Sequence, residues 1–129
     1  MIVVDAGVAL DALTRDDDVG ARARSRIEEG PLAPELIGIE VVSALRKLAA
    51  AKIIQSARAE LAVTDFTDLP FVLTPHWPLL ARCWELRDNL TTYDAAYVAL
   101  AELFEARLVT ADRRLASAPG IRCEVEVLD

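Results

Sequence analysis

A chain of 129 residues is long enough to bury a sizeable core, and we expect one domain over residues 1–129. With 53% hydrophobic and 27% charged residues, the composition is typical of a globular protein rather than a disordered one. The net charge of −7 argues against a broad electrostatic grip on nucleic acid. A negative net charge does not exclude a site that binds phosphate through a metal ion.

The residue types also argue against membrane, secreted and triad-based proteins. The longest uncharged run, 69–81, is too short and too rich in proline to span a membrane, and the apolar N-terminus lacks the basic residues of a secretory signal. Cys83 and Cys123 do not make a disulfide framework or a zinc site. His76 is the only histidine, which removes Ser-His-Asp and Cys-His chemistry. We therefore expect a cytoplasmic protein with reduced cysteines.

Strand and helix patterns alternate along the chain. In the first half we predict a strand at 2–4, a helix at 19–29 capped by Asp18, a short strand at 32–33, and helices at 35–51 and 56–67. In the second half we predict a strand at 71–74, helices at 78–89 and from Thr91 or Thr92 to 105, a strand at 107–110, a helical turn at 113–118 and an edge strand at 123–128. This order predicts the α/β class, with a mainly parallel central sheet covered by helices on both faces.

Acidic residues lie in or beside four apolar segments, at Asp5, Glu40, Asp94 and Asp112. Asp5 and Asp112 follow predicted strands, and ligands of parallel sheets bind beyond the carboxyl ends of the strands. Like charges gather in apolar surroundings only when something positive joins them. Because these segments offer few basic partners, we expect a hard divalent cation, Mg²⁺ or Mn²⁺, which prefers oxygen ligands.

Three of the four acidic residues also have a simpler interpretation. Asp5 and Asp112 each precede a helical turn that they could cap, and Asp94 stands three residues after Thr91, as in a capping box. Glu40 lies inside its predicted helix, where capping is not available and no helical ion-pair partner exists. A buried pair with a distant arginine is the remaining alternative for Glu40. Gly38 suggests a close backbone approach beside it.

Other candidate residues are open to two interpretations. Core packing is the default for the aromatic residues near the proposed site, but Tyr93 and Tyr97 flank Asp94 and stay candidates for stacking on bases. Arg113 and Arg114 are as consistent with phosphate contact as with a solvated surface pair. The first half also carries basic residues that would form a local basic face: Arg22, Arg24, Arg26, Arg46, Lys47 and Lys52.

Four blocks of sequence, 2–7, 34–46, 91–102 and 108–115, resemble the motifs of PIN-domain ribonucleases in order and spacing. The nearest type is the VapC toxin of bacterial toxin–antitoxin pairs. The resemblance implies a PIN-like α/β/α sandwich and a Mg²⁺- or Mn²⁺-dependent endoribonuclease that hydrolyses RNA with a metal-activated water. It also implies a homodimer and a VapB-like antitoxin.

The family's acidic positions map onto four residues that would be catalytic and would bind the metal directly or through water: Asp5, Glu40, Asp94 and Asp112. Thr110 matches the family's hydroxyl position, which would hydrogen-bond the ligands or a water behind them. Gly7 departs from the pattern, because serine, threonine or asparagine is common there. Its missing side chain would weaken metal binding.

Three other functions compete with this interpretation. A phosphoryl-accepting receiver domain needs a late lysine, and no lysine follows Lys52. A metal-dependent phosphatase acting on small molecules would use the same residue types. A catalytically weak or inactive PIN-like module that binds RNA or protein is the alternative favoured by Gly7.

Overall fold

Five short parallel strands form one sheet, in the order β3-β2-β1-β4-β5, in the computed structural model, which describes residues 1–129. The strands are β1 (Ile2–Val4), β2 (Leu32–Pro34), β3 (Val72–Thr74), β4 (Arg107–Thr110) and β5 (Val125–Val127). The amide of Asp5 extends the β1–β4 pairing by donating to the carbonyl of Val109 at 3.1 Å. The predictions of a parallel sheet and of an edge position for the last strand are confirmed.

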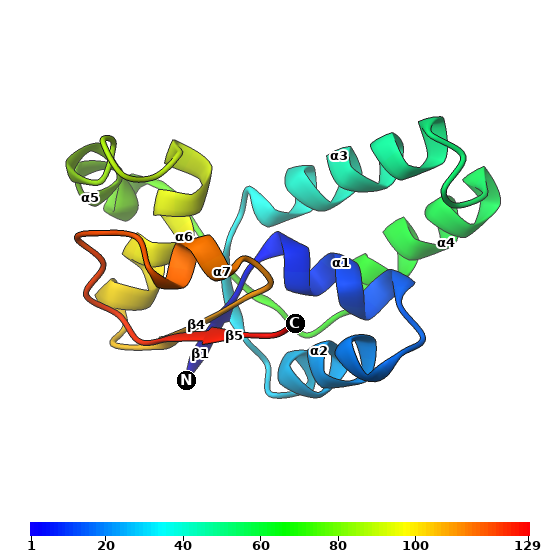
Figure 1. Cartoon of the computed structure of the whole chain (residues 1–129), viewed down its shortest axis with the longest axis horizontal. Helices are drawn as coiled ribbons and strands as arrows, with labels where there is room; N and C mark the ends of the chain where they lie inside the picture. Colours follow the sequence, from blue (N-terminus) through cyan, green and yellow to red (C-terminus); the bar gives the residue numbers. More distant parts are fainter.

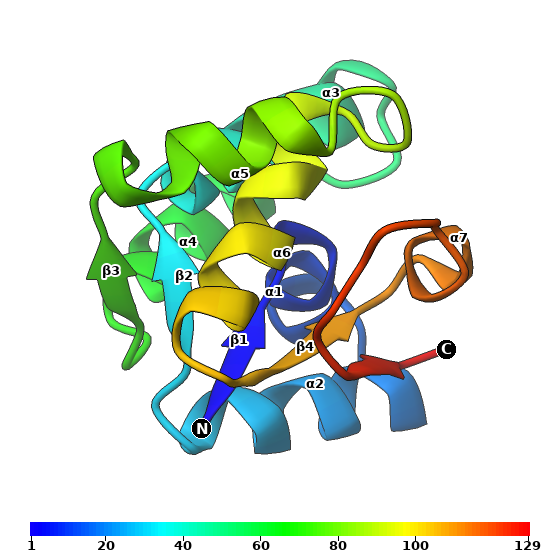
Figure 2. The same cartoon turned by 90° about the vertical axis from the view of Figure 1, so that its left-hand side faces the viewer.

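Helices cover both faces of this sheet (Figures 1 and 2). They are α1 (Ala6–Thr14), α2 (Asp18–Glu28), α3 (Ile37–Ala50), α4 (Ser56–Thr67), the 3-10 helix η1 (Trp77–Leu79), α5 (Leu80–Glu85), α6 (Thr92–Leu103) and α7 (Arg113–Ala116). Val3 packs in the larger apolar core with residues of α3 and α6, whereas Ile2 and Val4 pack on the other face with residues of α1 and α2. The predicted α/β/α sandwich is confirmed. None of the helices is both long and apolar enough to cross a membrane.

The first helices differ from the prediction in extent. Helix α1 runs for nine residues where only a helical turn was expected. The side chain of Asp17, not Asp18, caps α2 by accepting from the amide of Gly20 at 3.1 Å, so this helix begins one residue early.

Two later helices are shorter than predicted. Helix α3 begins at Ile37 rather than at residue 35. The amide of Glu35 donates to the carbonyl of Thr74, and the amide of Leu36 donates to Nε2 of His76 at 2.9 Å, so both residues are held beside β3 and the segment after it. His76 is therefore a structural residue that fixes the entry to α3. The helix predicted at 78–89 is split, with a 3-10 turn before α5 and an end at Glu85.

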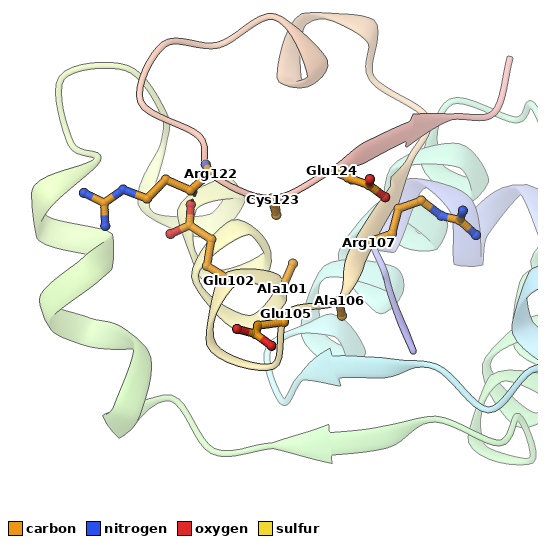
Figure 3. A pocket seen from close by; sticks show the side chains of 8 residues that line it. All are labelled: Ala101, Glu102, Glu105, Ala106, Arg107, Arg122, Cys123 and Glu124. Carbon is orange, nitrogen blue, oxygen red and sulfur yellow. Dashed lines mark hydrogen bonds between the residues drawn. The ribbon is translucent and has the colours of Figure 1, made fainter.

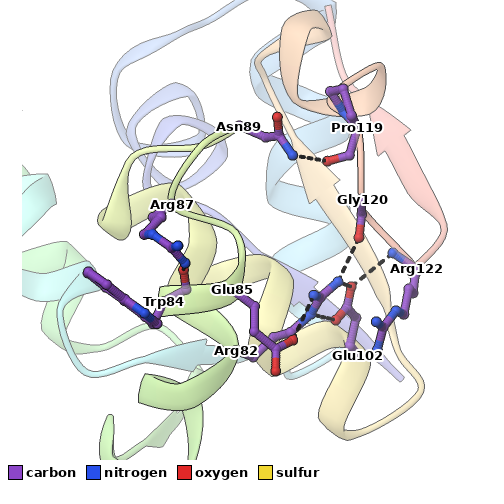
Figure 4. A network of polar contacts seen from close by, with 9 residues as sticks. All are labelled: Arg82, Trp84, Glu85, Arg87, Asn89, Glu102, Pro119, Gly120 and Arg122. Atoms are coloured by element: carbon purple, nitrogen blue, oxygen red, sulfur yellow. Dashed lines mark hydrogen bonds and ion pairs between the residues drawn. The ribbon is translucent and has the colours of Figure 1, made fainter.

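Arg82 on α5 ties the C-terminal half of α6 to the loop before β5 (Figure 4). Its guanidinium donates to the carboxylate of Glu102 at 2.6 Å and to the carbonyl of Gly120 at 2.6 Å. The amide of Arg122 donates to the same carboxylate at 2.9 Å. Burial raises the pKa of Glu102, but these hydrogen bonds outweigh it and leave the pKa lowered. The network anchors one end of the helix whose other end carries Asp94.

Gly20 and Gly38 provide a matched test of the packing. A Cβ on Gly20 would lie 2.1 Å from the carbonyl oxygen of Arg15, whereas a Cβ on Gly38 would lie 3.8 Å from Phe66, an ordinary contact. The close approach expected at Gly38 was therefore wrong. We expect Gly20→Ala to lower the free energy of unfolding by about 1–3 kcal/mol and Gly38→Ala to raise it by up to about 1 kcal/mol. Urea denaturation measures both, and equal effects would contradict the assigned packing of α1 against α2.

Candidate functional site

The four acidic candidates lie in or beside the elements at the carboxyl edge of the sheet, where Figure 1 shows β1 leading into α1 and β2 leading towards α3. Asp5 ends β1 and Asp112 follows β4, while Glu40 and Asp94 lie in the first turns of α3 and α6. Asp94 and Glu40 both raise the pKa of Asp5, so these three carboxylates interact through space. Asp94 and Asp112 line one cavity of about 280 Å³. The fold thus brings together residues that are far apart in the sequence.

Asp5 is held by both of its carboxylate oxygens. Oδ1 accepts from the amide of Val8 at 3.0 Å and caps α1, while Oδ2 accepts from the hydroxyl of Thr110. The hydroxyl oxygen of Thr110 in turn accepts from the amide of Asp112 at 3.0 Å. Asp5 therefore caps α1, as the simpler interpretation predicted, and it also belongs to the acidic group. Fully buried Thr110 links the ends of β1 and β4.

The pKa of Asp5 is raised to about 6. Burial is the largest cause, followed by the hydrogen bonds from Thr110 and Val8, which lower the pKa, and by the charges of Asp94 and Glu40, which raise it again. Neither a lysine nor an arginine pairs with this carboxylate. Its ionised form therefore lies in surroundings that favour a bound cation.

Glu40 has a partner that the sequence did not suggest. The hydroxyl of Tyr97 donates to its Oε1 at 2.7 Å, so the alternative of an arginine pair is wrong. Burial raises the pKa of Glu40, the Tyr97 hydrogen bond lowers it, and Asp94 raises it again. Tyr97 is only 2% exposed and cannot stack on a base. Its position three residues after Asp94, on the same side of α6, is the signal that could have linked it to the site.

Arg113 and Arg114 form ion pairs with different carboxylates. Arg114 pairs with Asp112 at 3.3 Å and, with it, lines the cavity that also contains Asp94. The hydrogen bonds from Arg114 lower the pKa of Asp112. Arg113 instead pairs with Asp129. Arg114 is therefore the basic residue that the structure brings to the acidic candidates.

The amide of Asp94 donates to the hydroxyl of Thr91 at 3.2 Å, which confirms Thr91 as the cap of α6. The carboxylate of Asp94 accepts no hydrogen bond from the protein.

Comparison with known proteins identifies the family. A family model described as "PIN domain" matches residues 2–121. Ribonuclease VapC9 of Mycobacterium tuberculosis (strain ATCC 25618 / H37Rv) is 40% identical over 129 residues, which cover 99% of this chain and 98% of that protein. The chain belongs to the PIN domain family, among the VapC-type proteins.

Solved structures share this PIN fold. PAE2754 from Pyrobaculum aerophilum superposes with a TM-score of 0.75 at 24% identity, over 98% of this chain and 83% of the other. A structure of VapBC2 from Rickettsia felis, bound to a DNA fragment from its promoter, gives a TM-score of 0.71 at 13% identity over 100% of both chains. These likenesses establish the architecture.

The donor set of this PIN domain fits a hard divalent cation. Its candidate ligands are all carboxylates. The pKa is raised in two of them, Asp5 and Glu40, and the carboxylate of Asp94 accepts no hydrogen bond from the protein. No group of three or more His, Cys, Asp or Glu side chains is already arranged to hold a metal ion. Gly7 has room for a side chain, since a Cβ there would lie 3.4 Å from the Cβ of Ala111 and 3.5 Å from Oδ1 of Asp5. Steric crowding therefore does not explain the glycine at this position. The missing hydroxyl is a chemical difference from the family pattern.

A second polar cavity, of about 450 Å³, lies at the opposite edge of the PIN domain, before β4 and β5 (Figure 3). Two of its charged groups serve the fold. Glu102 pairs with Arg82 and Arg107 pairs with Glu126, whereas the side chain of Arg122 points away from the cavity. None of the four acidic candidates lines this cavity.

Half of the predicted basic face is structural. On α2, Arg22 donates to the carbonyl of Asp129, Arg24 donates to the carbonyls of Ala12 and Arg15, and Arg26 pairs with Glu126. These three side chains hold the helix in place. The other members, Arg46, Lys47 and Lys52, have no ion pair.

The raised pKa of Asp5 predicts a pH-dependent stability. Between the ordinary pKa of 3.8 and about 6, the unfolded chain loses this proton while the folded chain keeps it, so the free energy of unfolding falls as the pH rises through that window. We expect Asp5→Asn to raise the free energy of unfolding at neutral pH, in chelator, by an amount on the order of 1–2 kcal/mol. The gain should vanish below the ordinary pKa.

Urea denaturation across this pH range, with Asp16→Asn as the exposed control, measures the effect. A gain of the same size at acidic and neutral pH would contradict the electrostatic cause.

Proposed function

We propose that this chain is a Mg²⁺- or Mn²⁺-dependent endoribonuclease that acts as the toxin of a type II toxin–antitoxin pair. The observation that carries the proposal is the carboxylate of Asp5, which has a pKa of about 6, interacts with Asp94 and Glu40, and has no basic partner. Such surroundings favour a cation. The 40% identity with a protein named as a ribonuclease supports RNA as the substrate.

We assign the metal to the four carboxylates of Asp5, Glu40, Asp94 and Asp112, which would bind it directly or through water. When bound, the metal supplies positive charge to the phosphate and lowers the pKa of the attacking water. Thr110 holds the Asp5 carboxylate and Tyr97 holds that of Glu40, so both are fixed before substrate arrives. The Asp94 carboxylate is free of protein donors and can take a proton from, or orient, the attacking water.

Two protein partners follow from the same proposal. A VapB-like antitoxin fits, because a structure that shares this fold is of VapBC2 from Rickettsia felis and because the Asp5 carboxylate, which has no basic partner, would attract basic side chains. A homodimer fits the exposed apolar surface of η1 and α5, where Trp77 is 82% and Trp84 is 68% exposed.

Light scattering would measure a dimeric mass, and a monomer at working concentrations would contradict it. We place the working protein in the cytoplasm.

Two observations favour the alternative, an inactive module that binds RNA or protein. The acidic side chains are not already arranged as a metal site, and Gly7 supplies no hydroxyl beside Asp5. A module of this kind would not need all four carboxylates for RNA affinity.

The deciding experiment is cleavage of a mixed cellular RNA pool by antitoxin-free protein in Mg²⁺, in Mn²⁺ and in chelator. We expect cuts at discrete sites that require metal and that disappear in Asp5→Asn and Glu40→Gln, because both variants remove a ligand charge. Glu60→Gln, an exposed residue of α4, is the matched control and should cut normally. Adding the cognate antitoxin should abolish cleavage.

A readout independent of catalysis accompanies this assay. Metal should raise the free energy of unfolding of the wild type by about 2.7 kcal/mol at a hundredfold excess over Kd, and much less in Asp5→Asn. Intact RNA and no metal effect, in folded protein, would overturn the nuclease and favour the binding module. Nucleotide hydrolysis without RNA cleavage would favour the phosphatase.

A further inference from the structure

We propose that a cavity beside the acidic candidates binds one nucleotide of single-stranded RNA next to the bond that is cut. The cavity has a volume of about 490 Å³ and lies between α3 and the start of α6. It is lined by Ile39, Glu40, Ser43, Ala44, Lys47 and Tyr93. The base would stack on the ring of Tyr93 and a phosphate would contact Lys47. This inference rests on the proposed function, whose substrate it describes more closely.

The position of the cavity follows from the two helices that form it. Glu40 belongs both to the cavity and to the acidic candidates, and Tyr93 directly precedes Asp94. Lys47 stands two turns along α3 from Glu40, about 10 Å along the helix axis. A strand whose phosphate lies at the acidic group can therefore place a neighbouring base at Tyr93 and a neighbouring phosphate at Lys47.

Tyr93 has the exposure that stacking requires. It is 65% exposed and makes no side-chain hydrogen bond, in contrast to buried Tyr97, which is committed to Glu40. Ile39, 77% exposed, adds an apolar surface to the same cavity. A nucleobase offers a flat apolar face to such a ring, and stacking of this kind tolerates any base.

Lys47 supplies a positive charge for contact with the RNA backbone. It has no ion pair, and the carboxylate of Glu40 in the same cavity is already engaged by Tyr97. An apolar protein segment placed here would cover a lysine without a partner, which is costly. A nucleotide brings an aromatic face and a phosphate together, so the chemistry of the cavity favours RNA.

The test compares Tyr93→Ala, Tyr93→Phe and Lys47→Ala, with Arg46→Ala as the matched control on the same helix outside the cavity. Fluorescence anisotropy gives the Kd for labelled oligoadenylate and for an abasic ribose-phosphate strand, in Mg²⁺ and in chelator. Cleavage of the same oligoadenylate, where it occurs, gives KM and kcat.

We expect Tyr93→Ala to raise the Kd for oligoadenylate about tenfold, Tyr93→Phe to leave it unchanged, and neither to alter binding of the abasic strand. Lys47→Ala should lower the slope of log Kd against log salt by about 0.7, the value for one phosphate contact of a single strand, whereas Arg46→Ala should not. In cleavage, the loss should appear in KM rather than kcat.

Equal binding by the wild type, Tyr93→Ala and Lys47→Ala would overturn the subsite. So would an unchanged RNA affinity combined with weaker binding of the antitoxin by Tyr93→Ala, which would assign the cavity to a protein partner. Failure of the proposed function looks different. In that case RNA is bound with the expected dependence on Tyr93 and Lys47 but is not cut in any metal.

Discussion

The hydroxyl of Thr110 holds the structure of the acidic edge together. It donates to Asp5 and accepts from the amide of Asp112, so one fully buried group joins the ends of two adjacent strands. Without such donors, a partly buried carboxylate beside two others would repel them or take up a proton. The hydrogen bonds from Thr110 and Val8 oppose this tendency but leave the pKa of Asp5 at about 6. The Asp5 carboxylate at the carboxyl edge of the sheet is thus held in place but has no positive charge beside it.

The remaining carboxylates depend on how α3 and α6 are placed. Helix α3 starts where the imidazole of His76 accepts the amide of Leu36, which brings Glu40 into the first turn, where the helix dipole favours a negative charge. Helix α6 is capped by Thr91 at one end and fastened by Arg82 and Glu102 near the other. Tyr97 then connects the two helices through Glu40. These contacts position Glu40 and Asp94 without pairing either carboxylate with a positive charge, which is what a cation-binding site requires.

Local patterns in the sequence predicted the strands, the order of the elements and the acidic residues that meet, because strand alternation and strand-end positions are local properties. They missed the length of α1, whose buried residues Val8, Ala9, Ala12 and Leu13 lie in a mostly apolar segment where Asp11 is the only charged residue, so no clear polar face reveals its period. They also missed the Tyr97–Glu40 bond, which joins residues 57 apart, and the separate places of Arg113 and Arg114. Such contacts are decided by tertiary packing, which spacing along the chain does not encode.

The division of the basic residues explains how a chain with a net charge of −7 can meet RNA. The arginines of α2 are bound to carbonyls and to Glu126, so their side chains are held against the protein rather than free to contact phosphate. The unpaired cations Arg46 and Lys47 lie on α3, the helix that also carries Glu40. Because phosphate contacts set affinity in proportion to their number, we expect such a chain to bind RNA weakly outside the proposed site. Under this proposal, binding depends on the few groups around the acidic residues: a metal, Lys47, Arg114 and one exposed aromatic ring. That arrangement favours local recognition of a single strand over nonspecific electrostatic binding of nucleic acid.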